Sequence, residues 1–256
     1  MSALRSLAGR IRWEQKQYWR NPAAAAFSFA FPLLFLVVFT AINGNERVHL
    51  AGGTVKFAQF YVPAMVTFGL VQACYTNLAF TVTVRRETGV LKRTRGTPIQ
   101  PWLYLAGMIG SVVVVALILT ALTTVLGIVA YGVTAPKAAL AIVLTIGAAG
   151  FCFSALGLAV STIVPNQDAA PAIVNFIVFP LLFISGTFGR IANTSFLGRL
   201  AALFPVRHLN LAMVDAFNPF GSSGSVPWGH LAVLVAWGIG GVAIALRRFR
   251  WEPRSH

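Results

Sequence analysis

Long apolar runs separated by short charged segments dominate this sequence. Residues Phe57 to Val84 form an uncharged run of 28 residues, and Gly96 to Pro136 form another of 41. A helix that crosses about 30 Å of hydrocarbon needs about 20 consecutive apolar residues. Runs of this length therefore predict membrane-spanning helices.

The same pattern repeats along the rest of the chain. It predicts six spans within a single domain, residues 1–256, and the spans lie at about 23–42, 59–83, 102–131, 139–164, 171–188 and 228–246. Along the fourth of them, small residues recur every three or four positions, a spacing that lets a second helix approach closely. They are Gly147, Gly150, Ser154, Gly157 and Ser161.

Residues 1–21 predict a basic amphipathic helix that lies in the membrane interface. Apolar residues share one helical face (Leu4, Leu7, Ala8, Ile11 and Tyr18) and basic residues share the other (Arg5, Arg12, Lys16 and Arg20). Such helices place the apolar face toward the acyl chains. The alternative is a solvated tether whose periodicity is accidental.

The longest polar stretch, Gly189 to Val226, separates the fifth and sixth predicted spans. It contains apolar residues at helical spacing, namely Phe196, Leu200, Leu203 and Phe204. A freely solvated loop has no use for such a stripe, so we expect a short helical extracellular cap that dips into the outer interface. The predicted fold class is thus an all-α integral membrane protein.

Composition and charge placement agree with this interpretation. The chain is 57% hydrophobic and only 10% charged, whereas a soluble domain is about 25% charged. Its net charge of +14 comes from residues at the ends of apolar runs, which suits anionic lipid headgroups better than nucleic acid. Fourteen of the 20 Lys and Arg residues fall on one side of the six-span topology. The positive-inside rule therefore predicts a multi-pass plasma-membrane protein with both termini in the cytoplasm.

Catalytic or metal-binding constellations are not apparent. The predicted spans contain no Asp, Glu, Lys or Arg, the four histidines are scattered, and Cys74 and Cys152 lie in apolar runs. A proton-coupled transporter or a membrane hydrolase needs such groups at suitable spacing. The sequence also lacks a Gly-x-x-x-x-Gly-Lys-Ser/Thr phosphate loop, so any ATP would have to be bound by another chain.

Uncharged polar residues are concentrated on two of the predicted spans. The second span contains Thr67, Gln72, Thr76, Asn77 and Thr81, and the fifth contains Asn175 and Ser185. Such groups are costly in lipid unless they find partners or line a cavity. Interhelical hydrogen bonding and cavity lining remain equally good interpretations at this point.

The segment Arg85–Pro98 carries five basic residues within eleven positions. It also carries Glu87 and the apolar Val90 and Leu91, and Gly96-Thr97-Pro98 would end any helix there. A short helix with both charged and apolar groups predicts a docking element for a cytoplasmic partner. The alternative is a basic loop that only sets the orientation.

Several short motifs resemble those of type-2 ABC exporter permeases. The segment Arg86-Glu87, Gly89-Val90-Leu91-Lys92-Arg93 and Thr97-Pro98 is similar to their signature loop after the second span. The end of the fifth span, Phe183 to Phe188, and the later Leu203-Phe204-Pro205 are similar to two further family segments. Thr94 stands where a leucine-like residue is expected, which leaves the register of the loop helix open. The resemblance covers nearly the whole chain.

This resemblance implies the ABCG-like fold and a membrane subunit that is not itself an enzyme. Such permeases pair with an identical or homologous permease and bind two copies of a cytoplasmic ATPase, which holds ATP and magnesium, so this chain would need no cofactor or metal of its own. The implied coupling residues are Arg86, Glu87, Gly89, Leu91, Lys92, Arg93, Thr97 and Pro98.

The resemblance also favours cavity lining for the second and fifth spans. The implied substrate path comprises Phe68, Gln72, Thr76, Asn175, Phe179 and Leu182. An apolar, lightly polar path suits the export of a lipophilic or amphipathic molecule such as a drug, an antibiotic or a lipid. The competing hypothesis is a membrane anchor or assembly subunit that transports nothing.

Overall fold

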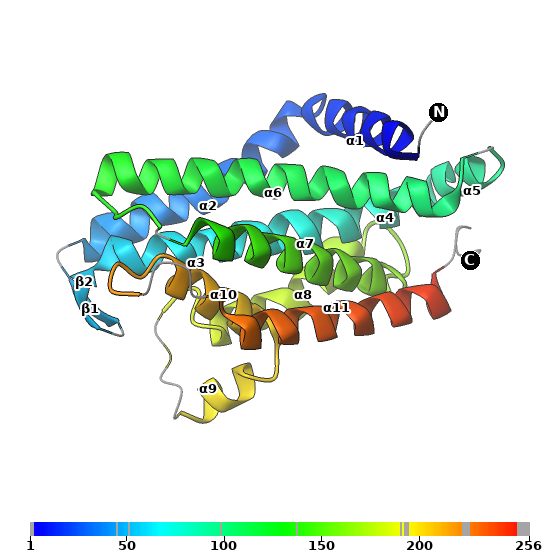
Figure 1. The fold of residues 1–256 in the computed structure, drawn as a ribbon. Helices are drawn as coiled ribbons and strands as arrows, with labels where there is room; N and C mark the ends of the chain where they lie inside the picture. Colours follow the sequence, from blue (N-terminus) through cyan, green and yellow to red (C-terminus); the bar gives the residue numbers. More distant parts are fainter. Residues whose placement is uncertain are drawn as a thin grey trace.

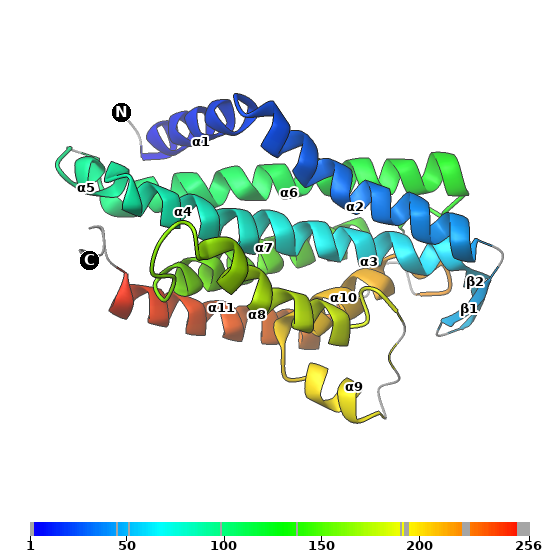
Figure 2. The same ribbon diagram turned by 180° about the vertical axis from the view of Figure 1, so that it is seen from behind.

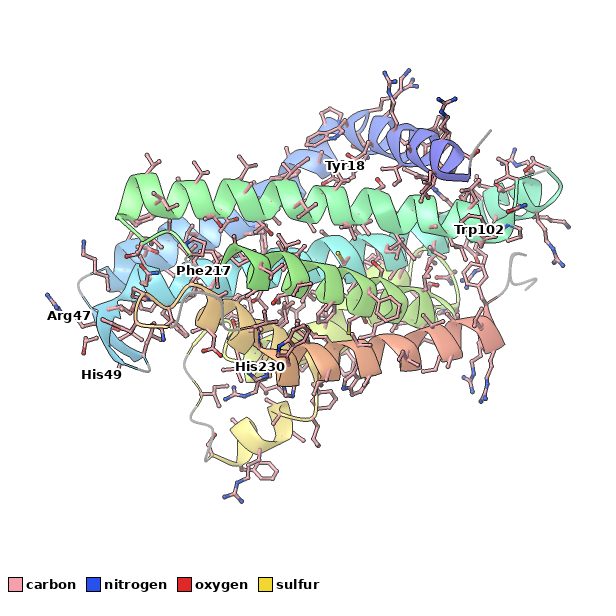
Figure 3. The ribbon with its side chains drawn as sticks, viewed as in Figure 1. Tyr18, Arg47, His49, Trp102, Phe217 and His230 are labelled. Atoms are coloured by element: carbon pink, nitrogen blue, oxygen red, sulfur yellow. The ribbon has the colours of Figure 1, made fainter. Side chains whose placement is uncertain are left out.

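The computed structural model describes residues 3–44, 46–50, 52–97, 99–136, 138–189, 191, 195–221 and 226–249. It is an elongated bundle of helices with a β-hairpin at one end (Figure 1). The short helix α5 (Val90–Arg95) lies at the opposite end, where α1 begins and α11 ends. Figure 3 places Arg47 and His49 at the hairpin end and Trp102 near α5.

Two helices form the N-terminal region. Helix α1 (Ala3–Trp19) lies along the outside of α6, and α2 (Pro22–Asn43) continues toward the hairpin end. The side chain of Gln15 donates to the carbonyl oxygen of Ser111 at 2.7 Å. Helix α1 thus packs against the bundle, a contact that its periodicity alone did not predict, and its place in the membrane interface stays a prediction.

The second apolar run forms the centre of the bundle. It comprises α3 (Phe57–Val71), the π-helical turn η1 (Gln72–Thr76) and α4 (Asn77–Glu87), joined without a break. In its most apolar window 89% of the residues are buried, against 28% in α11. This span is therefore surrounded by protein, whereas α11 lies at the periphery.

The remaining helices pack around that central span. They are α6 (Pro101–Tyr131), α7 (Ala139–Ser161), α8 (Ala170–Ile184), α9 (Phe196–Ala201), α10 (Pro205–Ala216) and α11 (Trp228–Arg248). Figure 2, seen from behind, shows α8 beside α4 and α3. A Cβ added at Gly157 would lie 2.7 Å from the carbonyl oxygen of Tyr75, so glycine there permits close packing of α7 on η1.

The structure adds detail to two expectations. The segment between the first two predicted spans contains a short antiparallel hairpin, β1 (Arg47–Leu50) and β2 (Gly53–Lys56), in an otherwise helical fold. In the predicted cap, Phe196 and Leu203 are exposed, while the side chains of Leu209 and Met213 on α10 are fully buried. Helix α10 is thus part of the bundle and packs against α3, α7, α8 and α11. This packing buries the apolar face of α10, as an amphipathic helix requires.

Within the described residues, four helices are long and apolar enough to cross a membrane: Phe57–Glu87, Pro101–Tyr131, Ala139–Ser161 and Trp228–Arg248. Shorter apolar helical segments occupy Ser28–Asn43 and Ala170–Ile184. The architecture is therefore that of a helical multi-pass membrane protein with four to six apolar helices.

Candidate substrate cavity and coupling segment

A largely apolar cavity of about 650 Å³ lies beside the central span. Its walls come from α2, α3, η1, α4, α6 and α8, and Tyr18 of α1 also lines it. Five of the six residues implied for the substrate path lie on this wall, namely Phe68, Gln72, Thr76, Asn175 and Phe179. Leu182 does not: its side chain is fully buried in the core, outside the cavity lining.

The π-helical turn gives this wall its polar groups. In the described part of the chain, neither Gln72 Oε1 nor Thr76 Oγ1 has a hydrogen-bond partner, although both atoms are buried. A buried polar atom without a partner carries a free-energy cost of about 1–3 kcal/mol. Turns of π-helix are frequent at functional sites. Both residues line the cavity, so the wall there holds two polar atoms whose hydrogen-bonding capacity is unused.

Sequence reasoning missed the contributions of α2 and α6. Phe31 and Pro32 of α2 line the cavity together with Leu119 of α6. The ring centroids of Phe31 and Phe68 lie 6.0 Å apart, and Phe68 also meets Phe188 edge-on at 5.6 Å. The aromatic residues of the first predicted span, residues 23–42, were a signal for this wall. Hydropathy alone, however, does not say which face of a span meets its neighbours.

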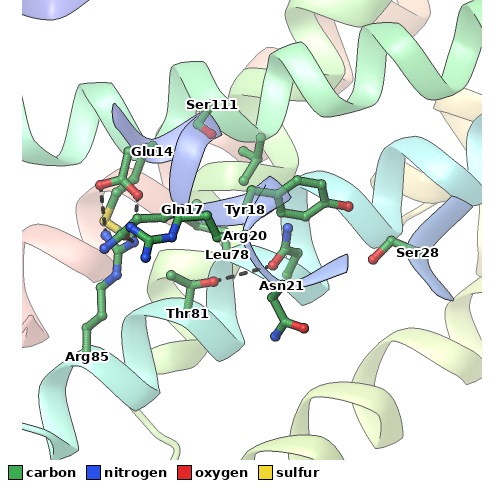
Figure 4. Close-up of a pocket in the computed structure, with 13 residues that line it drawn as sticks. Glu14, Gln17, Tyr18, Arg20, Asn21, Ser28, Leu78, Thr81, Arg85 and Ser111 are labelled. Atoms are coloured by element: carbon green, nitrogen blue, oxygen red, sulfur yellow. Dashed lines mark hydrogen bonds and ion pairs between the residues drawn. The ribbon is translucent and has the colours of Figure 1, made fainter. Parts of the chain in front are cut away.

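A second, polar pocket of about 490 Å³ lies between α1, α4 and α6 (Figure 4). Its most buried charge is Glu14, whose carboxylate is bound by two arginines. Arg85 donates from Nη2 to Glu14 Oε2 at 2.6 Å and from Nη1 to Oε1 at 2.8 Å, and Arg10 pairs with Oε1. This buried network fastens α1 to the last turn of α4.

Tyr18 lines both pockets. Burial raises the pKa of its phenol above the ordinary value, and the nearby Ser28 side chain offsets part of that rise. The phenol is thus a neutral group at physiological pH, and it adds no charge to either pocket.

The predicted coupling residues divide into an inward-facing and an outward-facing group. Arg86 is buried and donates from Nη1 to the carbonyl oxygen of Ser161 at 2.8 Å and from Nη2 to that of Val164 at 2.7 Å. Its Nε lies 3.3 Å from Glu87 Oε1. Arg86 therefore caps the C-terminal end of α7, where orphan carbonyls favour a cation.

Helix α5 is fixed by Leu91, whose side chain is fully buried. Gly89 precedes the helix at φ = +70°, a conformation that favours glycine and lets the chain turn between α4 and α5. Lys92, Arg93 and Thr97 are exposed, and Pro98 lies outside the described residues. The outer surface of α5 is thus basic and available.

The chain also matches a known protein family. The model of the ABC-2 type transporter family matches residues 10–218, which include both pockets and the coupling segment. The chain belongs to the ABC-2 type transporter family. No curated protein matches it significantly.

Family membership settles several coarser points. An ABC-2 membrane domain is a permease without ATPase activity, so this chain is not an enzyme. The family match also confirms the resemblance of its motifs to those of ABC-2 permeases. ABC-2 permeases generally pair with ATPase subunits. The described residues contain no group of three or more His, Cys, Asp or Glu that could hold a metal ion.

Proposed function

We propose that this ABC-2 permease exports a lipophilic or amphipathic molecule from the cytoplasm by alternating access. The observation that carries the proposal is the cavity beside η1. It combines an aromatic wall with the unpartnered Gln72 Oε1 and Thr76 Oγ1, and ligand cavities are commonly apolar with a few placed polar groups. A protein that only anchors a partner needs no such cavity.

The cavity and the coupling segment belong to one continuous element. Helix α4 runs from η1 directly to Arg86, and α5 follows after Gly89. A movement of α5 would therefore reach the cavity wall through a single helix, and through Arg86 it would also reach α7. In the proposal, two copies of a cytoplasmic ATPase hold ATP and magnesium and move α5, and a second permease, identical or homologous, completes the transporter.

Charge distribution supports the orientation in this proposal. The basic residues of α1, α5 and the end of α11 gather at the α5 end of the bundle, among them Arg5, Lys92, Arg93, Arg95, Arg247 and Arg248. Positive residues near span ends favour the cytoplasmic side. We therefore propose a plasma-membrane protein with six spans, both termini in the cytoplasm, α5 toward the ATPase and the hairpin outside.

The experiment compares two neighbouring positions on α8. Asn175 lines the cavity, whereas the side chain of Phe176 is 80% exposed and lies outside it. The permease is copurified with the ATPase encoded beside it and reconstituted in vesicles. ATP-dependent movement of lipophilic dyes is then measured for Asn175→Trp and for the control Phe176→Trp.

We expect Asn175→Trp to reduce transport at least about tenfold, because it fills the cavity, and Phe176→Trp to leave it near the wild-type rate. Equal rates for both variants would contradict a path through this cavity. A wild-type complex that binds the ATPase but moves no dye, with ATP turnover unaffected by Asn175→Trp, would instead favour the anchor hypothesis.

A further inference from the structure

The two pockets described above lie next to each other and differ in polarity. Tyr18, Ser28 and Asn77 line both of them, so the polar pocket and the apolar cavity adjoin at these three side chains. The polar part lies beside α1 toward the α5 end, and the apolar part lies deeper along η1. A molecule that fills both parts must itself be polar at one end and apolar at the other.

The polar pocket has an excess of positive charge. Among the described residues that line it, Glu14 carries the one carboxylate, which Arg10 and Arg85 already bind. Arg85 Nη2 also donates to Gln17 Oε1 at 2.7 Å. Arg20 lines the same pocket, and within the described residues it has no ion-pair partner. A cationic headgroup would meet this excess charge unfavourably, whereas an anionic one would neutralise it.

The apolar cavity supplies a complementary environment for a hydrocarbon tail. Phe29, Phe68, Phe80 and Phe179 contribute to its wall, and among the described residues that line it the phenol of Tyr18 is the only ionisable group. Burial of a hydrocarbon chain against such a wall is favourable in proportion to the apolar area removed from water. The volume of about 650 Å³ lies within the range of about 300–1,000 Å³ that is usual for small-molecule sites.

We propose that the polar pocket and the adjoining apolar cavity together bind an anionic amphiphile as cargo. Its headgroup would lie beside Arg20 and its tail along Phe68 and Phe179. This inference rests on the proposed export function and specifies its substrate class. A resident anionic membrane lipid offers the same chemistry as a transported molecule, so the experiment must separate binding from movement.

The test uses three probes with the same 12-carbon tail: dodecyl phosphate, dodecylphosphocholine and dodecyltrimethylammonium. Binding of each probe is measured on the permease–ATPase complex in nanodiscs of zwitterionic lipid. The variants are Arg20→Gln for the head region and Asn175→Trp for the tail region. Arg12→Gln is the matched control, because Arg12 is an exposed arginine on α1, the helix that Arg20 directly follows, and lies outside both pockets.

We expect wild type to bind dodecyl phosphate best and Arg20→Gln to weaken that binding about fivefold, as loss of a partly exposed charge pair does. Dodecylphosphocholine binding should hardly change in Arg20→Gln, and Arg12→Gln should bind all probes as wild type does. Asn175→Trp should weaken binding of every probe, because all three carry the same tail.

A second measurement follows ATP-dependent movement of each labelled probe across the membrane of proteoliposomes. Charge-selective binding without ATP-driven movement would identify a resident lipid and overturn the cargo assignment. Movement of dodecylphosphocholine with no preference for phosphate, and no effect of Arg20→Gln, would overturn the inference but leave the export function intact. If no probe moves and Asn175→Trp has no effect, the export function itself fails.

Discussion

Arg86 and Lys92 are both basic residues of the coupling segment, yet the molecule uses them in opposite ways. Arg86 is buried and holds the end of α7, and Leu91 is also buried, whereas Lys92, Arg93 and Arg95 are exposed. The inward-facing group fixes where α5 sits, and the outward-facing group offers a surface to a partner. Substitutions in the two groups should therefore separate stability from association.

The largest effect is expected for Arg86→Ala. Removal of this side chain leaves the buried carbonyl oxygens of Ser161 and Val164 without their donors, which should lower the free energy of unfolding by about 3 kcal/mol. Thermal unfolding in mild detergent measures the change. Arg86→Lys should recover only part of the loss, since an ammonium cannot reach two carbonyls with the geometry of a guanidinium. An unchanged unfolding midpoint for Arg86→Ala would contradict a stabilising role for the bonds from Arg86 to the end of α7.

Leu91→Ala should destabilise by about 2–3 kcal/mol, because it leaves a cavity beneath α5 where the leucine is now fully buried. The same unfolding measurement applies, with Leu91→Met as a control of similar volume that should cost less than about 1.5 kcal/mol. Equal losses for the two variants would mean that packing volume is not what anchors α5.

A smaller loss, about 1 kcal/mol, is expected for Gly89→Ala, because alanine is strained at φ = +70°. Gly96→Ala is the matched control: that residue has φ = −78°, and the nearest atom to an added Cβ is 3.4 Å away. The difference between the two unfolding midpoints isolates the left-handed turn, and its absence would contradict the assigned backbone conformation.

The smallest effect on stability, within about 0.5 kcal/mol, is expected when Lys92, Arg93 and Arg95 are all replaced by Gln, since all three are exposed. Association with the ATPase should nevertheless weaken, measured by copurification and by substrate-stimulated ATP turnover. Replacement of Arg247 and Arg248 by Gln removes charge at the same end of the bundle without touching α5. If both sets of variants weaken association equally, general charge and not α5 recruits the partner.

Hydropathy was sufficient to predict most of the apolar helices, because about 20 consecutive apolar residues have few alternatives to a membrane span. The helix bounds agree closely at the third span, where the prediction of 102–131 meets α6 at Pro101–Tyr131. The six-span count and the role of the path residues stay predictions. The hairpin was missed although Val48, Leu50 and Val55 with Gly52-Gly53 carried a short strand-turn-strand signal.

The directions of neighbouring side chains could not be predicted from the sequence. Arg85 and Arg86 are adjacent, but Arg85 reaches Glu14 on α1 while Arg86 reaches the end of α7. His208 and His230, which are far apart in the sequence, bring their Nδ1 atoms to 2.8 Å. Such contacts depend on which helices become neighbours, and that follows from packing of the whole bundle.

The π-helical turn at Gln72–Thr76 also acts as an angular offset within the second span. Such a turn holds one residue more than the α-helix needs for the same length, and each residue rotates an α-helix by about 100°. Everything after η1, including Arg85 and Arg86, is therefore turned relative to α3 by that single residue. The direction in which the coupling segment faces is thus set by the number of residues in η1, deep in the bundle, as well as by the side chains at the end of α4.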